Sequence, residues 1–515
     1  MIGFGEAAAI LIFFVCLSFV IFNGTIGGVT CIVALLAYFL WTKRLNEYWI
    51  RRGIPAPKPN FFFGNFLQMS KGIHLYDLEN AKKYGPVYGG TLIGLRELNV
   101  CDVDMLRRIL IQDFAAFPNR VIADYFIGNQ AIRQNMVNVM RDQHWKDVRK
   151  TITPAFTPGR IEKVGCPLVF LAFFGHFSMD VIAQSAFGVD LSTQRDHDSK
   201  FVYYAKKMFE LKFVDYRIML LTLFPNLARL VERSFNFQLI GNSCDAFFED
   251  VLRRIVEQRR KNPRKVNPDF LQLLLDTVEG SDSVEVDEEL MNEAVASGKK
   301  VNGEVALTEG ELIAQGYLFL VAGYETTATT LQFIIYSLAA NPHVQEIAHK
   351  QIVDTVGDKE VIGHDDIMKM PYIEQVMNET LRMYPPVPRN DRKCKSNITL
   401  KGTTIEKDTF VFVPTFALHY DERYYPNPQV FDPDRFSPTE KAKRDPLTFV
   451  PFGIGPRTCM GMRFAQMEIR LTLAYLLRKF EFSVPEDLLG KPLELDTTGM
   501  TKSKGPTFIT VKRRN

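Results

Sequence analysis

One of the seven cysteines lies in a glycine-rich segment that has the composition of a tight loop leading into a helix. Residues 452–461 read Phe-Gly-Ile-Gly-Pro-Arg-Thr-Cys-Met-Gly, and apolar residues at helical spacing follow them. Cys459 would therefore lie near a helix N-terminus and beside Arg457, and both features lower the pKa of a thiol. An isolated cysteine more often has a structural role in a core. A single thiolate cannot complete a zinc site, but it can be the axial ligand of haem iron.

A second group of polar residues interrupts a long apolar segment. Residues 322–327 read Ala-Gly-Tyr-Glu-Thr-Thr in the middle of a helix that we expect over residues 308–340. Thr308 and Glu311 match a capping box at its start. Glycine and threonine both weaken a helix interior, so we expect a locally distorted helix beside a ligand. An ordinary core helix is the alternative, and a membrane span is disfavoured by Glu325.

Glu379 and Arg382 are three residues apart on the polar face of a helix expected over residues 372–383. An isolated pair of this kind is usually a solvated surface contact that contributes about 0.2–0.5 kcal/mol. Its burial would change that magnitude, because an unpaired buried charge destabilises a protein by roughly 3–5 kcal/mol.

The composition is that of a globular chain. Of 515 residues, 46% are hydrophobic and 23% charged, which excludes a wholly disordered or fibrous protein. The 62 Lys and Arg nearly balance the 59 Asp and Glu, so charge gives no reason to expect a nucleic-acid partner. Helical patterns dominate, with short β-like segments at residues 86–99, 398–400 and 409–413. We therefore expect one large, mainly α domain with small β-sheets.

The N-terminal segment has the pattern of a membrane anchor. Residues 7–42 contain no charged side chain and form two apolar runs, 7–22 and 26–41. Either run with its flanks could span a bilayer. Lys43 and Arg44 follow directly, which places the rest of the chain in the cytosol. The expected division is an anchor of one or two apolar segments over residues 1–50, a Pro-rich connector over 51–59 and a catalytic domain over 60–515.

The loop around Cys459 resembles the haem-binding signature of the cytochrome P-450 superfamily, F-x-x-G-x-R-x-C-x-G, and matches every specified position. Three more segments resemble motifs of this family in the family's order, namely W-x-x-x-R at residues 145–149, A-G-x-[DE]-T-[ST] at 322–327 and E-x-x-R at 379–382. The resemblance covers nearly all of residues 50–515. It is strongest to the clan of vertebrate drug-oxidising and nematode or insect haem-thiolate monooxygenases.

The resemblance implies the cytochrome P-450 fold, with haem b between the long central helix and the cysteine loop. Cys459 would ligate the iron, and Thr326 with Glu325 would hold water and carry protons to the site of oxygen reduction. Glu379, Arg382 and Arg435 would form a buried network that holds the cysteine loop in place. The residues that would bind the haem propionates are Trp145, Arg149, Arg457, Arg120 and Arg389.

The implied activity is the insertion of one oxygen atom of dioxygen into a lipophilic substrate. Electrons would come from NADPH through the NADPH–cytochrome reductase of the endoplasmic reticulum membrane, with cytochrome b5 as a second candidate donor. The catalytic domain would face the cytosol. Two other functions stay open at this point. A haem-thiolate isomerase or dehydratase would act on a peroxide without a reductase, and a non-catalytic protein would only bind haem or lipid.

Overall fold

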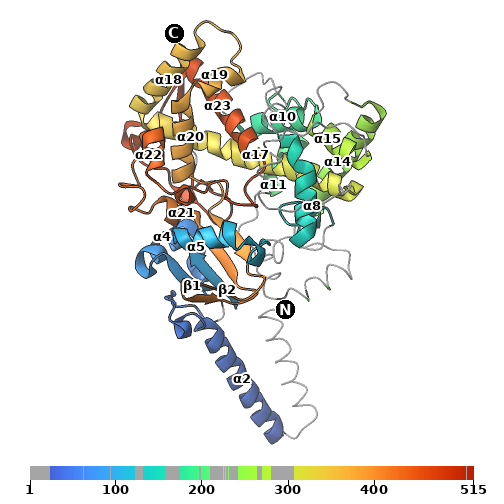
Figure 1. Cartoon of the computed structure of the whole chain (residues 1–515), viewed down its shortest axis with the longest axis vertical. Coiled ribbons are helices and arrows are strands. Elements are labelled where there is room, and N and C mark those ends of the chain that lie inside the picture. Colours follow the sequence, from blue (N-terminus) through green and yellow to red (C-terminus); the bar gives the residue numbers. More distant parts are fainter. Residues whose placement is uncertain are drawn as a thin grey trace.

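The computed structural model describes residues 24–61, 63–92, 94–121, 131–156, 174–195, 199–208, 224, 227, 230, 242–263, 269–279, 307–505 and 507–514. Helices dominate these residues and the sheets are small (Figure 1), so the predicted mainly α fold is confirmed. The first apolar run, residues 7–22, lies outside the described residues.

The helical body surrounds one long helix, α17 (Glu309–Ala340), which crosses it (Figure 1). The other long helices are α4 (Ile73–Tyr84), α8 (Asp142–Ile152), α10 (Phe174–Phe187), α11 (Lys200–Met208), α14 (Asn242–Lys261), α15 (Phe270–Glu279), α18 (Pro342–Val356), α20 (Pro371–Met383) and α23 (Met462–Lys479). The short helices are α3 (Phe66–Met69), α5 (Val103–Arg107), α7 (Ala131–Gln134), α19 (His364–Met368), α21 (Thr415–His419) and α22 (Pro438–Ala442).

The start of α17 follows from its capping box. The Thr308 hydroxyl accepts the backbone N–H of Glu311, and the Glu311 carboxylate accepts the backbone N–H of Thr308 at 2.8 Å. Two of the backbone donors that a helix start leaves unpaired are thereby satisfied. The helix is long and apolar enough to cross a membrane, but more than half of its most apolar stretch is buried inside the protein. It is therefore a core helix.

Small sheets border the helical body. The largest has the strand order β1 (Val87–Leu92), β2 (Leu95–Val100), β6 (Phe410–Pro414) and β3 (Arg389–Lys393). Only its β2–β6 pair is parallel. The β-like segment expected over residues 86–99 is thus two strands joined by a turn. The two-stranded sheets pair β4 (Ile398–Leu400) with β5 (Thr403–Ile405), β7 (Phe480–Ser483) with β10 (Thr510–Arg513), and β8 (Leu495–Asp496) with β9 (Lys502–Ser503).

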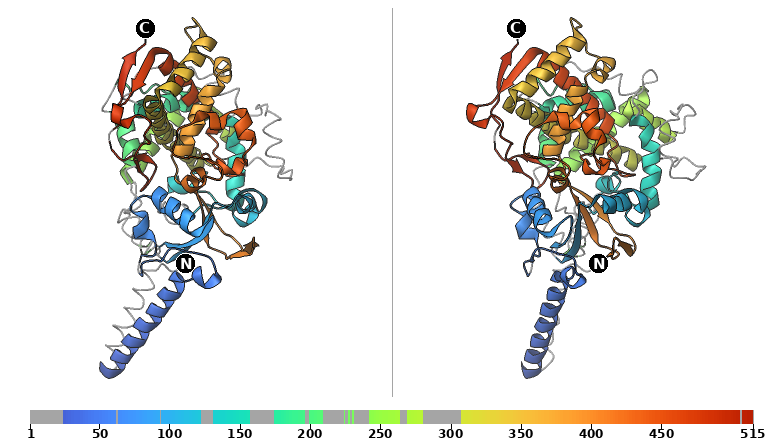
Figure 2. Two further views of the ribbon diagram at one scale, coloured as in Figure 1. Left: turned by 90° about the vertical axis from the view of Figure 1, so that its left-hand side faces the viewer. Right: turned by 60° about the vertical axis from the view of Figure 1, so that its left-hand side comes forward.

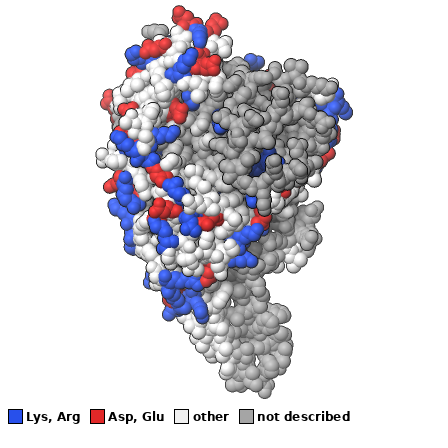
Figure 3. Space-filling model, in the orientation of Figure 1, with Lys and Arg blue, Asp and Glu red and all other residues white. Residues whose placement is uncertain are grey.

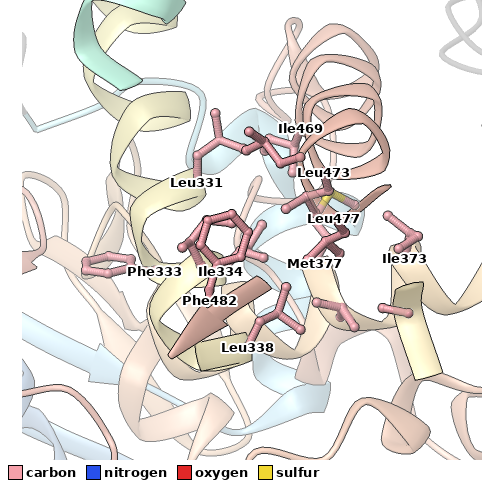
Figure 4. Packing of buried hydrophobic residues seen from close by; sticks show 14 of the residues in the cluster. Leu331, Phe333, Ile334, Leu338, Ile373, Met377, Ile469, Leu473, Leu477 and Phe482 are labelled. Carbon is pink, nitrogen blue, oxygen red and sulfur yellow. The ribbon is translucent and has the colours of Figure 1, made fainter. Parts of the chain in front are cut away.

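A core cluster fixes α17 against the helix that follows the cysteine loop. Leu331, Ile334 and Leu338 of α17 face Leu473 and Leu477 of α23 (Figure 4), and all five are fully buried. Met377 of α20 and Phe482 of β7 complete this contact. Each such buried side chain contributes roughly 1.5–3 kcal/mol. This packing sets the position of the cysteine loop relative to the centre of α17.

Helix α2 (Gly24–Asn46) contains the second predicted apolar run and projects away from the body in every view (Figures 1 and 2). Its apolar side chains are exposed, and those for which exposure is described include Val29, Ile32, Val33, Leu36 and Leu40. Lys43 and Arg44 occupy its last turn. Lys and Arg side chains gather where α2 joins the body, whereas the part of the helix farther from the body shows no charge on the face in view (Figure 3).

Candidate active site

The cysteine loop folds back on itself ahead of α23. Gly453 and Gly455 have φ angles of +70° and +79°, which side chains other than that of glycine adopt rarely. A Cβ atom on Gly455 would also lie 2.1 Å from the carbonyl oxygen of Leu110. The backbone N–H of Cys459 donates to the carbonyl of Phe452 at 2.9 Å and closes the loop. The two glycines of the predicted loop are therefore required by its shape.

The Cys459 side chain is exposed by surface area, yet the residue is surrounded by protein atoms, and this burial raises the pKa of the thiol. An exposed side chain in a residue enclosed by protein indicates that the sulfur faces an open space within the protein. The backbone at Gly461 and the charges of Arg120 and Arg149 lower the thiol pKa, but by less than burial raises it. The predicted net lowering of the thiol pKa by the helix N-terminus and Arg457 is therefore not found, because burial outweighs the backbone contribution and Arg457 is not among the charges that act on the thiol.

The Arg457 side chain contacts the part of the chain before α8. Its guanidinium donates to the backbone carbonyls of Pro118 at 3.0 Å, Val137 at 3.2 Å and Met140 at 2.8 Å. It also lies over the ring of Trp145, 3.6 Å from the centroid. Arg457 is 2% exposed, and burial followed by neighbouring arginines lowers its pKa to about 8. It fastens the loop to the chain before α8 rather than acting on the thiol.

Four arginines crowd together here with little opposing charge, namely Arg120, Arg149, Arg392 and Arg457. Burial and the other cations lower the pKa of Arg392 to about 9, and burial lowers that of Arg149 to about 10. Asp391 is the carboxylate that acts on Arg392 and Arg457. Among the described residues, the Nε atoms of Arg120 and Arg392 are buried without a hydrogen-bond partner. Buried cations are costly unless an opposite charge lies beside them, so we expect an anionic ligand to bind this cluster.

The centre of α17 faces an open space as well. Ala322 is exposed although most of this core helix is buried. The Thr326 hydroxyl donates to the carbonyl of Ala322 at 2.6 Å, so its lone pairs are left to accept further hydrogen bonds. Glu325 forms an ion pair with Lys502 at 2.8 Å. The helix is continuous from Glu309 to Ala340, so the predicted local distortion is limited to this side-chain contact.

The cytochrome P-450 family model matches residues 54–510 of the chain. The chain belongs to the cytochrome P-450 family. Cytochrome P-450 3A2 of Rattus norvegicus is 34% identical over 506 residues, which cover 94% of this chain and 96% of that protein. Cytochrome P-450 3A5 of Homo sapiens is 32% identical over 505 residues, which cover 94% of this chain and 96% of that protein.

As a cytochrome P-450, the protein is a haem-thiolate monooxygenase whose cofactor is haem with a cysteine thiolate as axial ligand. The residues present fit this group. A porphyrin with two propionates needs one open thiol and a cluster of cations beside it, and the structure offers Cys459 with the four crowded arginines. The buried Nε atoms of Arg120 and Arg392 supply donors that still lack acceptors.

Arg389 does not join this cationic cluster. It lies in a separate buried ionic network with two carboxylates. Its Nε and Nη2 atoms donate to Asp77, the former at 2.7 Å, and its Nη1 atom donates to Glu97 at 2.9 Å. The prediction that Arg389 binds a propionate conflicts with these contacts, since two carboxylates already balance its charge, whereas the guanidinium of Arg457 contacts only neutral carbonyls. Arg392 is in the cluster instead. Alternation along strand β3 puts residues three apart on opposite faces, and this signal could have separated the two.

The E-x-x-R motif of this cytochrome P-450 forms a fully buried network. Glu379 and Arg382 are both 0% exposed and make two hydrogen bonds of 2.7 Å with each other. The Nε atom of Arg435 lies 3.5 Å from a Glu379 oxygen, and the backbone N–H of Asp432 donates to the same oxygen at 3.0 Å. The structure therefore brings Glu379, Arg382 and Arg435 together as predicted.

Proposed function

We propose that Cys459 is the axial ligand of haem b in this monooxygenase and that the four clustered arginines bind the haem propionates. The observation that carries this proposal is an open thiol beside buried cations that lack acceptors. Trp145 supports the cluster by lying against Arg457. When bound, the haem supplies the activation of dioxygen, for which thiolate donation favours O–O cleavage.

Glu325 and Thr326 are the proposed carriers of protons. Insertion of one oxygen atom into a C–H bond consumes one dioxygen, two electrons and two protons, and the second oxygen atom leaves as water. Thr326 directs its hydroxyl hydrogen to Ala322, so its oxygen accepts from a water molecule in the open space. Glu325, mostly enclosed, gives and takes protons at its carboxylate beside that water.

The proposed location is the endoplasmic reticulum membrane, with the catalytic domain in the cytosol. Helix α2 supports it through its exposed apolar side chains and through Lys43 and Arg44 in its last turn. Whether residues 1–50 span the membrane once or twice depends on residues outside the described part of the chain. The substrate is proposed to be lipophilic and to reach the enzyme from this membrane.

The proposed electron donor is an NADPH–cytochrome reductase, with cytochrome b5 as a second candidate. Lys441 and Arg463 are exposed on either side of the cysteine loop in sequence and support contact with an acidic partner. Two further cations near the cysteine loop contribute less to such a contact. Arg457 is buried, and Lys443 is paired with Glu440 at 2.5 Å.

The test of the haem ligand is the ferrous–CO difference spectrum of Cys459→Ala, with Cys244→Ala as a matched control. Cys244 is buried, and the charges that act on its thiol are those of Lys207, Asp245 and Arg133, so the control loses a thiol whose neighbours do not belong to the proposed haem site. We expect the thiolate-type Soret band to disappear in Cys459→Ala and to persist in Cys244→Ala. An unchanged band in Cys459→Ala would show that another residue binds the iron.

A further inference from the structure

Glu325 is paired with a residue from the far C-terminal part of the chain. The Nζ atom of Lys502 in β9 lies 2.8 Å from Oε1 of Glu325 in α17. The Glu325 side chain is 13% exposed and that of Lys502 is 38% exposed. The ammonium group therefore reaches from the solvent side to a carboxylate that is mostly enclosed.

The backbone that carries Lys502 is fixed without this ion pair. The preceding residue, Thr501, is fully buried and donates its N–H to the Pro386 carbonyl at 2.9 Å and its hydroxyl to the Pro385 carbonyl at 2.6 Å. Lys502 is also paired in register with Asp496 of β8. Loss of the Lys502 side chain should therefore leave the β8–β9 hairpin in place.

The other charged or titratable neighbours do not replace Lys502. Burial, followed by the charge of Glu325, raises the pKa of Tyr324 to about 12, so this phenol stays neutral. The Asp496 carboxylate accepts from the backbone N–H and the hydroxyl of Thr498, at 2.9 and 2.7 Å. The cation shown in contact with the Glu325 carboxylate is that of Lys502.

We infer that Lys502 is a positioning residue for Glu325, which fixes the orientation of its carboxylate beside Thr326. This inference rests on the proposed role of Glu325 as a proton carrier. An enclosed carboxylate has few water molecules to hold it in place, and a charge-assisted hydrogen bond from Lys502 gives it a fixed partner instead. Because the cation comes from the C-terminal hairpin, this hairpin becomes part of the proton supply to the site.

The test is the coupling efficiency of Lys502→Met, measured as hydrogen peroxide released per NADPH oxidised by the full-length holoenzyme with a reductase. The probe is whichever of lauric acid, cholesterol and naphthalene shifts the Soret band most. We expect uncoupling to rise about three- to tenfold, a small part of the 10²- to 10⁴-fold that a positioned acid or base contributes. Haem content and the ferrous–CO spectrum should not change. Lys502→Arg should restore coupling because it retains the charge.

A matched control comes from the same hairpin region. Lys504 is paired with Glu494 at 3.5 Å, and both side chains are largely exposed, so Lys504→Met should leave coupling unchanged. Equal uncoupling in Lys504→Met and Lys502→Met would show that any loss of charge in this region disturbs the enzyme, and would overturn the inference.

The Glu325→Gln background separates this inference from the proposed function. If Lys502 acts through Glu325, Lys502→Met should have no additional effect in Glu325→Gln. Normal coupling in Glu325→Gln alone would refute the proton-carrier role itself. Uncoupling in Glu325→Gln together with normal coupling in Lys502→Met would leave that role intact and overturn only the positioning role of Lys502.

Discussion

The Nε2 atom of His419 accepts a hydrogen bond from the backbone N–H of Val450 at 3.1 Å. Val450 lies two residues before the cysteine loop begins. The Nδ1 atom of His419 lies 3.1 Å from the carbonyl of Arg382, so it carries the hydrogen and donates to that carbonyl. His419 is fully buried and thereby joins the Glu379–Arg382 network to the loop that contains Cys459. Both bonds require the neutral ring, since a protonated imidazole could not accept from Val450.

Burial, followed by the charge of Arg382, lowers the pKa of His419 to about 3. In the unfolded chain the pKa is about 6.5, so between these values the unfolded state binds one more proton and stability falls as the pH falls. Between pH 7 and pH 5 this single group should remove about 2 kcal/mol of stability. The urea midpoint of His419→Gln should depend less on pH over this range than that of the wild type. The exposed His343 gives the control, and equal pH dependence in His419→Gln and His343→Gln would contradict the assignment.

Arg392 and Arg389 should have opposite phenotypes. Arg392→Gln removes a donor that we propose for a propionate, and hydrogen bonds to charged groups are worth roughly 1.5–3 kcal/mol, so haem should dissociate about ten- to a hundredfold faster. Arg389→Gln instead leaves Asp77 and Glu97 buried without their cation and should lower the free energy of unfolding by about 3–5 kcal/mol. Haem transfer to apomyoglobin and urea unfolding measure the two effects. Faster haem loss from Arg389→Gln than from Arg392→Gln, with the fold intact, would reverse the assignment.

Glu379→Gln should destabilise the protein by about 3–5 kcal/mol, because Arg382 would remain fully buried without a counter-charge. Asp354 of α18 is the matched control, since both it and its partner Lys350, 2.5 Å away, are largely exposed. Asp354→Asn should change stability by no more than about 1 kcal/mol. Thermal unfolding of the two variants, followed at the Soret band and by circular dichroism, measures the difference. Similar unfolding temperatures would show that the buried network contributes little.

Thr326→Ala should retain haem and uncouple NADPH oxidation from product formation, because the hydroxyl that accepts from water is lost. Thr330→Ala is the control one turn along α17. Its hydroxyl donates to the Thr326 carbonyl at 2.7 Å and is buried, so it makes the same kind of bond without facing the open space. Peroxide release per NADPH should rise several-fold, on the order of tenfold, in Thr326→Ala only. Equal uncoupling in the two variants would indicate a general effect on the helix.

Local features were predictable from the sequence because local forces determine them. The capping box at Thr308 and Glu311, the tight cysteine loop and the i,i+3 pair of Glu379 and Arg382 each depend on residues a few positions apart. The family motifs added roles to these residues that spacing alone could not supply. The mainly α fold followed from the helical periodicity of the apolar residues.

Tertiary structure decided which charges meet and how well they are solvated. Burial outweighs the nearby cations at Cys459, so the thiol pKa is raised where the loop sequence predicted that it would fall. The face of β3 decided that Arg392 enters the cationic cluster while Arg389 pairs with Asp77 and Glu97. Only folding brought Lys502 to Glu325. Desolvation and long-range pairing depend on where residues lie in space, and the periodicity of a sequence does not contain that information.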